Sequence, residues 1–397
     1  MELSERVKRL KPSATLTITA CAKKMKKEGK DVLIFAAGEP DFDTPEHIKS
    51  AAKRALDEGF TKYTPTAGID ELKAAVCFRY KEDYKVTFEP KNVIVTVGGK
   101  HALFNAFLAL LNAGDEVIIL APYWVSYPPM VEIAGGVPKI VYMKEENCFA
   151  PTIEDIEAAM TNRTRAIVVN SPSNPTGCVI PRNVLQEIYD LCKSRKIFVI
   201  SDEIYDKLVY KTEPCTMFSM KGADFSNLMI INGVSKSYSM TGWRIGYAIG
   251  DESLIAAMGK IQDQSTSNPT SFAQKGALEA LLQSQDDLKN MLVEFDERRR
   301  LVHEGFNSID GLFSVEPKGA FYIFPNFSSY YGKKTPSGKV VSNSLDMADY
   351  LLNEAGVCLI PGEPFASDQH LRLSFATSKE DLKEGLKRVE RALKSLR

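Results

Sequence analysis

The chain has 397 residues, of which 44% are hydrophobic and 25% are charged, a composition typical of a globular protein large enough for two domains. Its 50 basic and 51 acidic residues leave a net charge of −1, which argues against nucleic acid or a membrane surface as a partner. The charged start "MELSERVKRLKPSA" shows no secretory signal and no apolar run is long enough to span a membrane, so we expect a cytoplasmic protein. The seven cysteines form no C-x-x-C pair, so we expect reduced thiols and no metal site.

Short apolar runs alternate with longer amphipathic stretches through the middle of the chain. The runs predict strands at 92–97, 115–120, 165–170, 196–201, 227–232 and 244–250, and residues 182–195 have helical spacing. Strands that alternate with helices predict an α/β fold, with a mostly parallel central sheet and helices on both faces.

The C-terminal third predicts a smaller α+β domain. Its pattern indicates a helical region at 270–309, strands at 319–325, 357–362 and 371–376, and helices at 345–355 and 378–396. The first 45 residues have no series of strands and are expected to pack with this part. We therefore predict a large domain of residues 46–290 and a small domain formed from residues 1–45 and 291–397.

Several predicted central strands end in a polar side chain or a glycine turn. Ligands of open α/β sheets bind beyond the carboxyl ends of the strands, so these residues are expected to converge on one cleft. The set consists of Gly98, Gly99, Lys100, Asn174, Asp202, Tyr205, Ser235, Lys236 and Arg244.

The residue types in this cleft indicate the ligand's chemistry. A glycine pair that opens a helix offers N–H groups to a phosphate, and Arg244 adds a bidentate contact. Asp202, just past a core strand, requires a cation such as a protonated ring nitrogen, and Lys236 is suited to attack a carbonyl. Phosphate, ring nitrogen and aldehyde together describe pyridoxal 5′-phosphate (PLP). P-loop and dinucleotide-binding glycine patterns are missing.

Motifs along almost the whole chain carry a family resemblance. The chain resembles the fold-type I, class I PLP aminotransferases, in the branch of bacterial and archaeal aspartate aminotransferases. The motifs are "AAGEPDFDTP" (36–45), "KYTPTAGIDELKAA" (62–75), "VTVGGKHALFNAF" (95–107), "PYWVSYP" (122–128), "NSPSNPTG" (170–177), "SDEIYD" (201–206), "SKSYSMTGWRIGY" (235–247), "PKGAFY" (317–322) and "LRLSFATS" (371–378).

The resemblance implies a role for each residue around the cofactor ring. Lys236 would hold PLP covalently and then move a proton between the substrate Cα and the cofactor. Asp202 would keep the ring nitrogen protonated, Asn174 and Tyr205 would bind the ring 3-oxygen, and Trp124 would stack on the ring.

The resemblance also implies a phosphate site shared between two subunits of a homodimer. Gly99, Lys100, Ser235 and Arg244 would line the phosphate side within one subunit. Tyr63 and Ser267 would reach the phosphate region of the partner subunit.

The substrate is expected to be a dicarboxylic amino acid, with L-aspartate as donor and 2-oxoglutarate as acceptor. Arg372 would bind the α-carboxylate, beside Gly38 and Asn174. Animal-type relatives bind the distal carboxylate through an arginine near the "SNP" segment, but residues 260–270 contain none. Aspartate-using members of the branch that this chain resembles carry instead a lysine after the two glycines and an "SAT" segment near the N-terminus. The resemblance therefore makes Lys100 the candidate for this role, with Ser13 and Thr15 beside it, and the alternative role of Lys100 is a second phosphate contact.

Other functions are left open by the residues alone. The same cofactor would serve another amino-group pair, with an aromatic amino acid, alanine or prephenate, and a PLP β-lyase is a further alternative. A non-enzymatic PLP-binding sensor module is disfavoured, because no appended DNA-reading segment is visible.

Overall fold

The computed structural model describes residues 2–10 and 14–397, and within these ranges the strands form three sheets. The largest, of seven strands, has the spatial order β2 (Val93–Thr96), β8 (Gly246–Ile249), β7 (Leu228–Gly233), β6 (Phe198–Asp202), β5 (Thr164–Asn170), β3 (Glu116–Ala121) and β4 (Val137–Tyr142). Neighbouring strands run parallel except at β8, which is antiparallel to β2 and β7. The predicted α/β class with a mostly parallel sheet is confirmed, and β4 is a strand that the sequence pattern did not predict.

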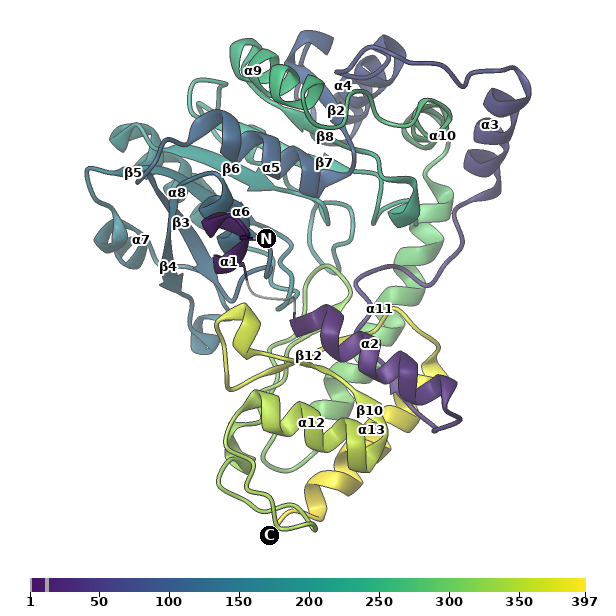
Figure 1. The fold of residues 1–397 in the computed structure, drawn as a ribbon, viewed down its shortest axis with the longest axis vertical. Coiled ribbons are helices and arrows are strands. Elements are labelled where there is room, and N and C mark those ends of the chain that lie inside the picture. The colour runs from purple at the N-terminus through teal and green to yellow at the C-terminus, as the bar shows by residue number, and fades with distance from the viewer. Residues whose placement is uncertain (1, 11–13) are drawn as a thin grey trace.

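Helices cover both faces of this sheet (Figure 1). They are α4 (Asp70–Tyr84), α5 (Gly99–Leu110), α6 (Tyr127–Ile133), α7 (Ile153–Ala159), α8 (Arg182–Arg195), α9 (Glu252–Asp263) and α10 (Ser271–Leu282). The helix α3 (Glu46–Asp57) packs against α10.

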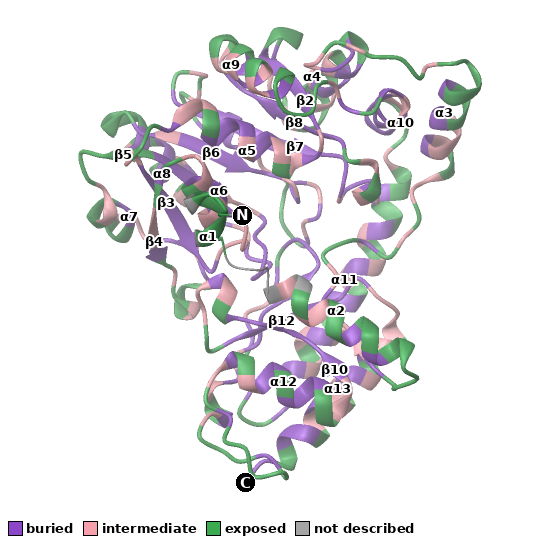
Figure 2. Cartoon of the chain, in the orientation of Figure 1, coloured by how far each residue is buried: buried purple, intermediate pink, exposed green. Residues whose placement is uncertain are grey.

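Successive strand residues point to opposite faces, and the two faces have separate hydrophobic cores. In β3, Ile118 belongs to the core that includes residues of α4, α8 and α10, whereas Val117 and Ile119 belong to the core that includes residues of α5, α6 and α9. Figure 2 shows the central strands, such as β6 and β7, as buried, which explains why the central runs are apolar without alternation.

Most of the remaining elements form a second body below this sheet (Figure 1). One two-stranded sheet pairs β1 (Leu33–Ile34) with β10 (Val357–Cys358), and a three-stranded antiparallel sheet has the order β11 (Ile360–Pro361), β12 (Leu371–Ser374), β9 (Tyr322–Ile323). Its helices are α2 (Ala14–Lys27), α11 (Asp286–Asn307), α12 (Ser344–Ala355) and α13 (Lys379–Lys394). The short helix α1 (Glu5–Arg9) is drawn beside α6 in this view and not with the second body (Figure 1). The parallel pairing of β1 with β10 joins the two ends of the chain. None of the helices in the described ranges is long and apolar enough to cross a membrane.

Two predicted elements divide in the structure. The predicted helical region 270–309 is α10 followed by α11, because Gln283 is extended and the Ser284 hydroxyl hydrogen-bonds Asp286 at the start of α11. The predicted strand 357–362 is β10 followed by β11. Leu359 separates them, so that β10 pairs with β1 while β11 pairs with β12.

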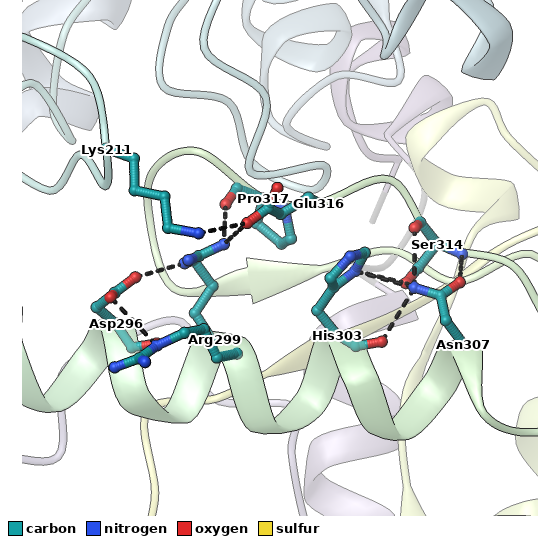
Figure 3. Close-up of polar contacts among 9 residues, drawn as sticks. Lys211, Asp296, Arg299, His303, Asn307, Ser314, Glu316 and Pro317 are labelled. Atoms are coloured by element: carbon teal, nitrogen blue, oxygen red, sulfur yellow. Dashed lines mark hydrogen bonds and ion pairs between the residues drawn. The ribbon is translucent and has the colours of Figure 1, made fainter.

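A buried arginine on α11 forms hydrogen bonds with the segment that precedes β9 (Figure 3). Arg299 is 1% exposed, and it donates to Asp296 at 2.8 Å, to Glu316 at 2.6 Å and to the carbonyl of Pro317 at 3.3 Å. Lys211 reaches the same Glu316 carboxylate at 3.4 Å. Charge-assisted bonds of this kind are strong when one partner is buried, so α11 fixes the chain just before Tyr322.

Candidate active site

The carboxyl ends of β5, β6 and β7 meet at one edge of the large sheet. Asn170, the last residue of β5, lies in register with Asp202, the last residue of β6. The Asn170 amide donates to the Asp202 carbonyl at 3.0 Å and accepts the N–H of Asn174 at 3.1 Å. Asn170 therefore ties the "SNPTG" loop to the end of the neighbouring strand, and the predicted convergence at this edge is present.

Asp202 is a buried carboxylate, only 3% exposed. The Tyr127 hydroxyl donates to its Oδ2 at 2.6 Å, and the Ile204 N–H donates to its Oδ1 at 3.2 Å. Burial raises the pKa of Asp202 to about 6, although the hydrogen bonds from Tyr127 and Ile204 and the charge of Lys236 lower it.

Lys236 lies in the turn that follows β7, and its Nζ donates to the carbonyl of Gly38 at 2.5 Å. Burial lowers the pKa of Lys236 to about 8. The guanidinium groups of Arg244 and Arg372 lower it further, and the carboxylate of Glu39 opposes them. The "AAGEP" segment and the lysine loop therefore meet at the amine.

Arg372, on β12, enters the same site from the second body. It is 3% exposed, and it donates to Asn174 Oδ1 at 2.8 Å and to the Ala36 carbonyl at 3.0 Å. Its guanidinium lies 4.5 Å from the ring centre of Tyr322 and 5.2 Å from that of Phe365. Its Nε is buried and has no hydrogen-bond partner in the described part of the chain. A buried guanidinium with a donor to spare is suited to an incoming carboxylate.

Tyr205 and Tyr322 form a hydroxyl pair beside this arginine. Their oxygens are 2.9 Å apart, and both side chains are buried. Burial raises the pKa of Tyr205 well above its ordinary value, so the hydroxyl is protonated and able to donate.

The start of α5 forms the next wall of the site. Gly98 has a φ of +84°, and a Cβ there would lie 2.4 Å from Arg244 Nη2. A Cβ at Gly246 would lie 2.2 Å from the Gly99 nitrogen, so β8 crosses directly against this helix terminus. Among the described residues no side chain caps α5, which leaves its first N–H groups available to an anion. Ser235, buried at 5% exposure, follows β7.

Lys100 and Trp124, two of the predicted residues, lie close to each other near the start of α5. The Lys100 ammonium, on the first turn of α5, lies 4.8 Å from the ring centre of Trp124. The Trp124 ring in turn meets the ring of Tyr127 edge-on, with centroids 5.3 Å apart.

For four predicted residues, the described part of the chain shows no contact with the site residues above. Tyr63 is 93% exposed, and Ser267 is exposed in a left-handed conformation with φ 55°. Thr15, on α2, is half-buried, and its Oγ1 has no partner among the described residues. Ser13 lies outside the described residues.

The structure adds three residues that the sequence pattern did not assign to the site: Asn170, Tyr127 and Tyr322. Tyr127 and Tyr322 lie inside the motifs "PYWVSYP" and "PKGAFY", and Asn170 ends a predicted strand. Their positions were visible, but the contacts of a tyrosine hydroxyl depend on how separate elements cross.

Comparison with known proteins shows a full-length relationship. The family described as aminotransferase class I and II matches residues 30–389. A probable aspartate/prephenate aminotransferase from Aquifex aeolicus is 44% identical over 397 residues, covering 99% of each chain. The aspartate aminotransferase of Bacillus subtilis is 44% identical over 392 residues, covering 98% of each chain.

Solved structures show the same relationship in three dimensions. The aspartate aminotransferase of Rhizobium meliloti has a TM-score of 0.96 at 41% identity, and the match covers 100% of both chains. The Thermus thermophilus aspartate aminotransferase with maleate has a TM-score of 0.93 at 44% identity, covering 99% of this chain and 100% of that chain. Sequence and architecture agree over nearly the whole length, and the predicted resemblance is confirmed: this chain belongs to the class I and II aminotransferase family.

Proposed function

We propose that this chain is a PLP-dependent aminotransferase that moves the amino group of L-aspartate to 2-oxoglutarate, giving oxaloacetate and L-glutamate. One observation carries the proposal. A lysine of lowered pKa, a buried carboxylate and a buried arginine with a spare donor converge at one edge of the sheet. The aspartate aminotransferases named among the relatives support the choice of donor.

The residues present fit PLP. Asp202 is buried, and in the described part of the chain its carboxylate accepts from a hydroxyl and an N–H but forms no ion pair, so a protonated ring nitrogen would complete it. The uncapped start of α5, with Gly99, Lys100, Ser235 and Arg244 around it, suits the phosphate. When bound, PLP supplies an electron sink for the substrate Cα.

Each side chain near the ring then has a task. Lys236 would bind the cofactor covalently, and its amine would move the proton at the substrate Cα. Asp202 would hold the proton on the ring nitrogen, and Asn174 and Tyr205 would donate hydrogen bonds to the ring 3-oxygen. Trp124 would cover one face of the ring and exclude water from it.

Two cationic side chains would each bind one carboxylate of the substrate. Arg372, which is hydrogen-bonded to Asn174, would bind the α-carboxylate that every amino acid carries. Gly38, whose carbonyl accepts from Lys236, would lie beside the same carboxylate. Lys100 is exposed and lies over Trp124, where it would bind the side-chain carboxylate of aspartate. Thr15 and Ser13 would complete that pocket. The relative solved with maleate, a dicarboxylate, supports a site for two acid groups.

Prephenate is a second candidate acceptor. The relative from Aquifex aeolicus is named a probable aspartate/prephenate aminotransferase, and one from Thermus thermophilus is named an aspartate/prephenate aminotransferase. Prephenate is a 2-oxo acid with a second carboxylate, so the same pair of cations would bind it.

We also propose a homodimer with shared active sites and a division into domains. Tyr63 and Ser267 are exposed in the single chain, which supports a role in the partner's phosphate site. The pairing of β1 with β10 supports a small domain formed by residues 1–45 and 291–397, with residues 46–290 as the large PLP-binding domain.

An amino-donor screen tests the proposal. The purified protein should be yellow, should lose that colour on borohydride treatment, and should form glutamate fastest with aspartate as donor and 2-oxoglutarate as acceptor. Lys236→Ala should lose nearly all turnover, because the amine that binds the cofactor and moves the proton is gone. Near-normal turnover of Lys236→Ala would rule out the assignment. A preference for alanine or an aromatic amino acid as donor would contradict the proposed substrate. Release of ammonia would contradict amino-group transfer and favour a β-lyase.

A further inference from the structure

Tyr127 connects two residues of the proposed cofactor site without belonging to the predicted set. It is the first residue of α6, and its side chain is 2% exposed. Its hydroxyl donates to Asp202 Oδ2 at 2.6 Å, and its ring meets the Trp124 ring edge-on. Burial raises the pKa of Tyr127 well above its ordinary value, so the hydroxyl keeps its proton and acts as a donor.

The surroundings of Asp202 make this donor important. Three ionisable groups face the carboxylate from the packed elements: Tyr127 from α6, Tyr205 from the turn after β6 and Lys236 from the turn after β7. In the described chain Tyr127 is the side chain that hydrogen-bonds the carboxylate. A buried carboxylate with so few donors tends to take up a proton itself.

We propose that Tyr127 is a positioning residue for the reaction, whose hydroxyl holds Asp202 as an anion and so keeps the shared proton on the cofactor's ring nitrogen. The inference rests on the proposed function, because it assumes that the ring nitrogen faces Asp202. It goes beyond that function by assigning control of the proton's location to Tyr127, which acts through its hydrogen bond to Asp202.

The direction of the effect follows from which form of the carboxyl the hydroxyl stabilises. A donated O–H stabilises the carboxylate and lowers the pKa of Asp202. Without it, the carboxyl competes better for the shared proton, and the proton moves from the ring nitrogen toward the carboxyl oxygen. A ring with an unprotonated nitrogen is a weaker electron sink, so turnover falls with it.

The direct test is the protonation of the ring nitrogen in the holoenzyme. Wild type and Tyr127→Phe are reconstituted with PLP carrying ¹⁵N in the ring, and the nitrogen resonance is recorded at neutral pH. Wild type should show a protonated ring nitrogen. In Tyr127→Phe the resonance should move toward the unprotonated position. In the pH profile of kcat, the apparent pKa below which kcat falls (the acid limb) should also rise by about one to two pH units in Tyr127→Phe. This is the shift expected for losing one hydrogen bond to a buried charge.

A matched control separates this effect from the general loss of a buried hydroxyl. Tyr350, on α12, is 4% exposed and donates one hydrogen bond to the Ala392 carbonyl at 2.7 Å. Tyr350→Phe removes a comparable bond away from the site, so it should leave the nitrogen resonance and the acid limb unchanged.

The outcomes are distinct. A wild-type nitrogen resonance in Tyr127→Phe, with or without a loss of thermal stability, overturns the inference and makes Tyr127 a packing residue. If Tyr127→Phe does not fold, 3-fluorotyrosine at position 127, a stronger donor, should shift the acid limb downward, and an unshifted limb overturns the inference. A wild-type protein that binds no PLP overturns the proposed function and this inference together.

Discussion

At the scale of single residues, burial shifts the pKa values of Asp202 and Lys236 in opposite directions. It destabilises the charged form of each, so it raises the pKa of Asp202 to about 6 and lowers the pKa of Lys236 to about 8. Both values approach neutral pH, where the amine is a usable nucleophile and proton carrier.

The first prediction concerns the pH dependence of cofactor loading. Only the neutral amine of Lys236 attacks the aldehyde, so the rate of covalent loading of the cofactor-free chain should rise about tenfold per pH unit below pH 8 and level off above it. Borohydride trapping followed by peptide mass spectrometry measures the rate at position 236. A rate that keeps rising to pH 10 would show an ordinary, solvated lysine.

The second prediction separates the two substrate cations. Lys100→Ala should lower kcat/KM for aspartate by about 30- to 1,000-fold, because the side-chain carboxylate loses a charged partner, worth about 2–4 kcal/mol. Activity toward phenylalanine should fall far less. Comparing kcat/KM for both donors in wild type and variant measures the difference.

Arg372→Ala is the control for this comparison, because it should lower activity toward both donors alike. Equal losses on aspartate and phenylalanine in Lys100→Ala, combined with weaker PLP binding, would make Lys100 a phosphate contact.

At the scale of secondary structure elements, the proposed phosphate site depends on the close approach of β8 to the start of α5. Gly246 lies so near this terminus that a Cβ would overlap the Gly98 and Gly99 backbone at 2.2–2.3 Å. A backbone contact cannot yield as a flexible side chain does, so any side chain at position 246 must push the two elements apart.

The third prediction follows from this contact. Gly246→Ala should reduce the free energy of unfolding by about 1–3 kcal/mol through overpacking and should weaken PLP binding, because the α5 terminus is displaced. Urea denaturation and PLP titration measure the two effects. Gly259→Ala on α9, where an added Cβ would have no neighbour within 4 Å, should be neutral or stabilise by up to about 1 kcal/mol. Unchanged PLP affinity in Gly246→Ala would show that the start of α5 does not bind the phosphate.

At the scale of the whole molecule, both bodies of the chain contribute residues to the candidate site, and we propose that a second subunit completes it. Arg372 comes from the second body, and Asp202 and Lys236 come from the large sheet. Tyr63 presents 93% of its surface to solvent in the single chain, which is unusual for a large aromatic side chain and is expected if a partner covers it.

The fourth prediction tests sharing of the site between subunits. Tyr63→Ala and Lys236→Ala should each form weakly active or inactive homodimers. Mixed dimers should regain activity above that of either parent, because one of their two sites then has a native lysine and a native partner tyrosine. Activity after subunit exchange, with the dimer confirmed by light scattering, measures this. Activity equal to the average of the parents would place Tyr63 outside the partner's site.

The fold class and the order of the polar strand ends follow from the amino-acid sequence alone. Strands buried on both faces require unbroken apolar runs, and a parallel sheet brings their carboxyl ends to one edge. This is why Asn174, Asp202 and Lys236 are predicted to lie together from their positions after successive apolar runs. The motifs around them predicted the family that the comparisons confirm.

Which atoms meet is a property of the tertiary structure. The bonds of Lys236 to Gly38 and of Arg372 to Asn174 each join residues 198 positions apart, and Tyr127 reaches Asp202 across 75 positions. β4, whose residues are only partly buried along much of its length, lacked the apolar run that predicted the other strands. A periodic pattern reports which face of an element is buried. The contacts of a side chain depend on the angle and distance at which separate elements pack, and those are set by the complementary shapes of their surfaces in the folded core.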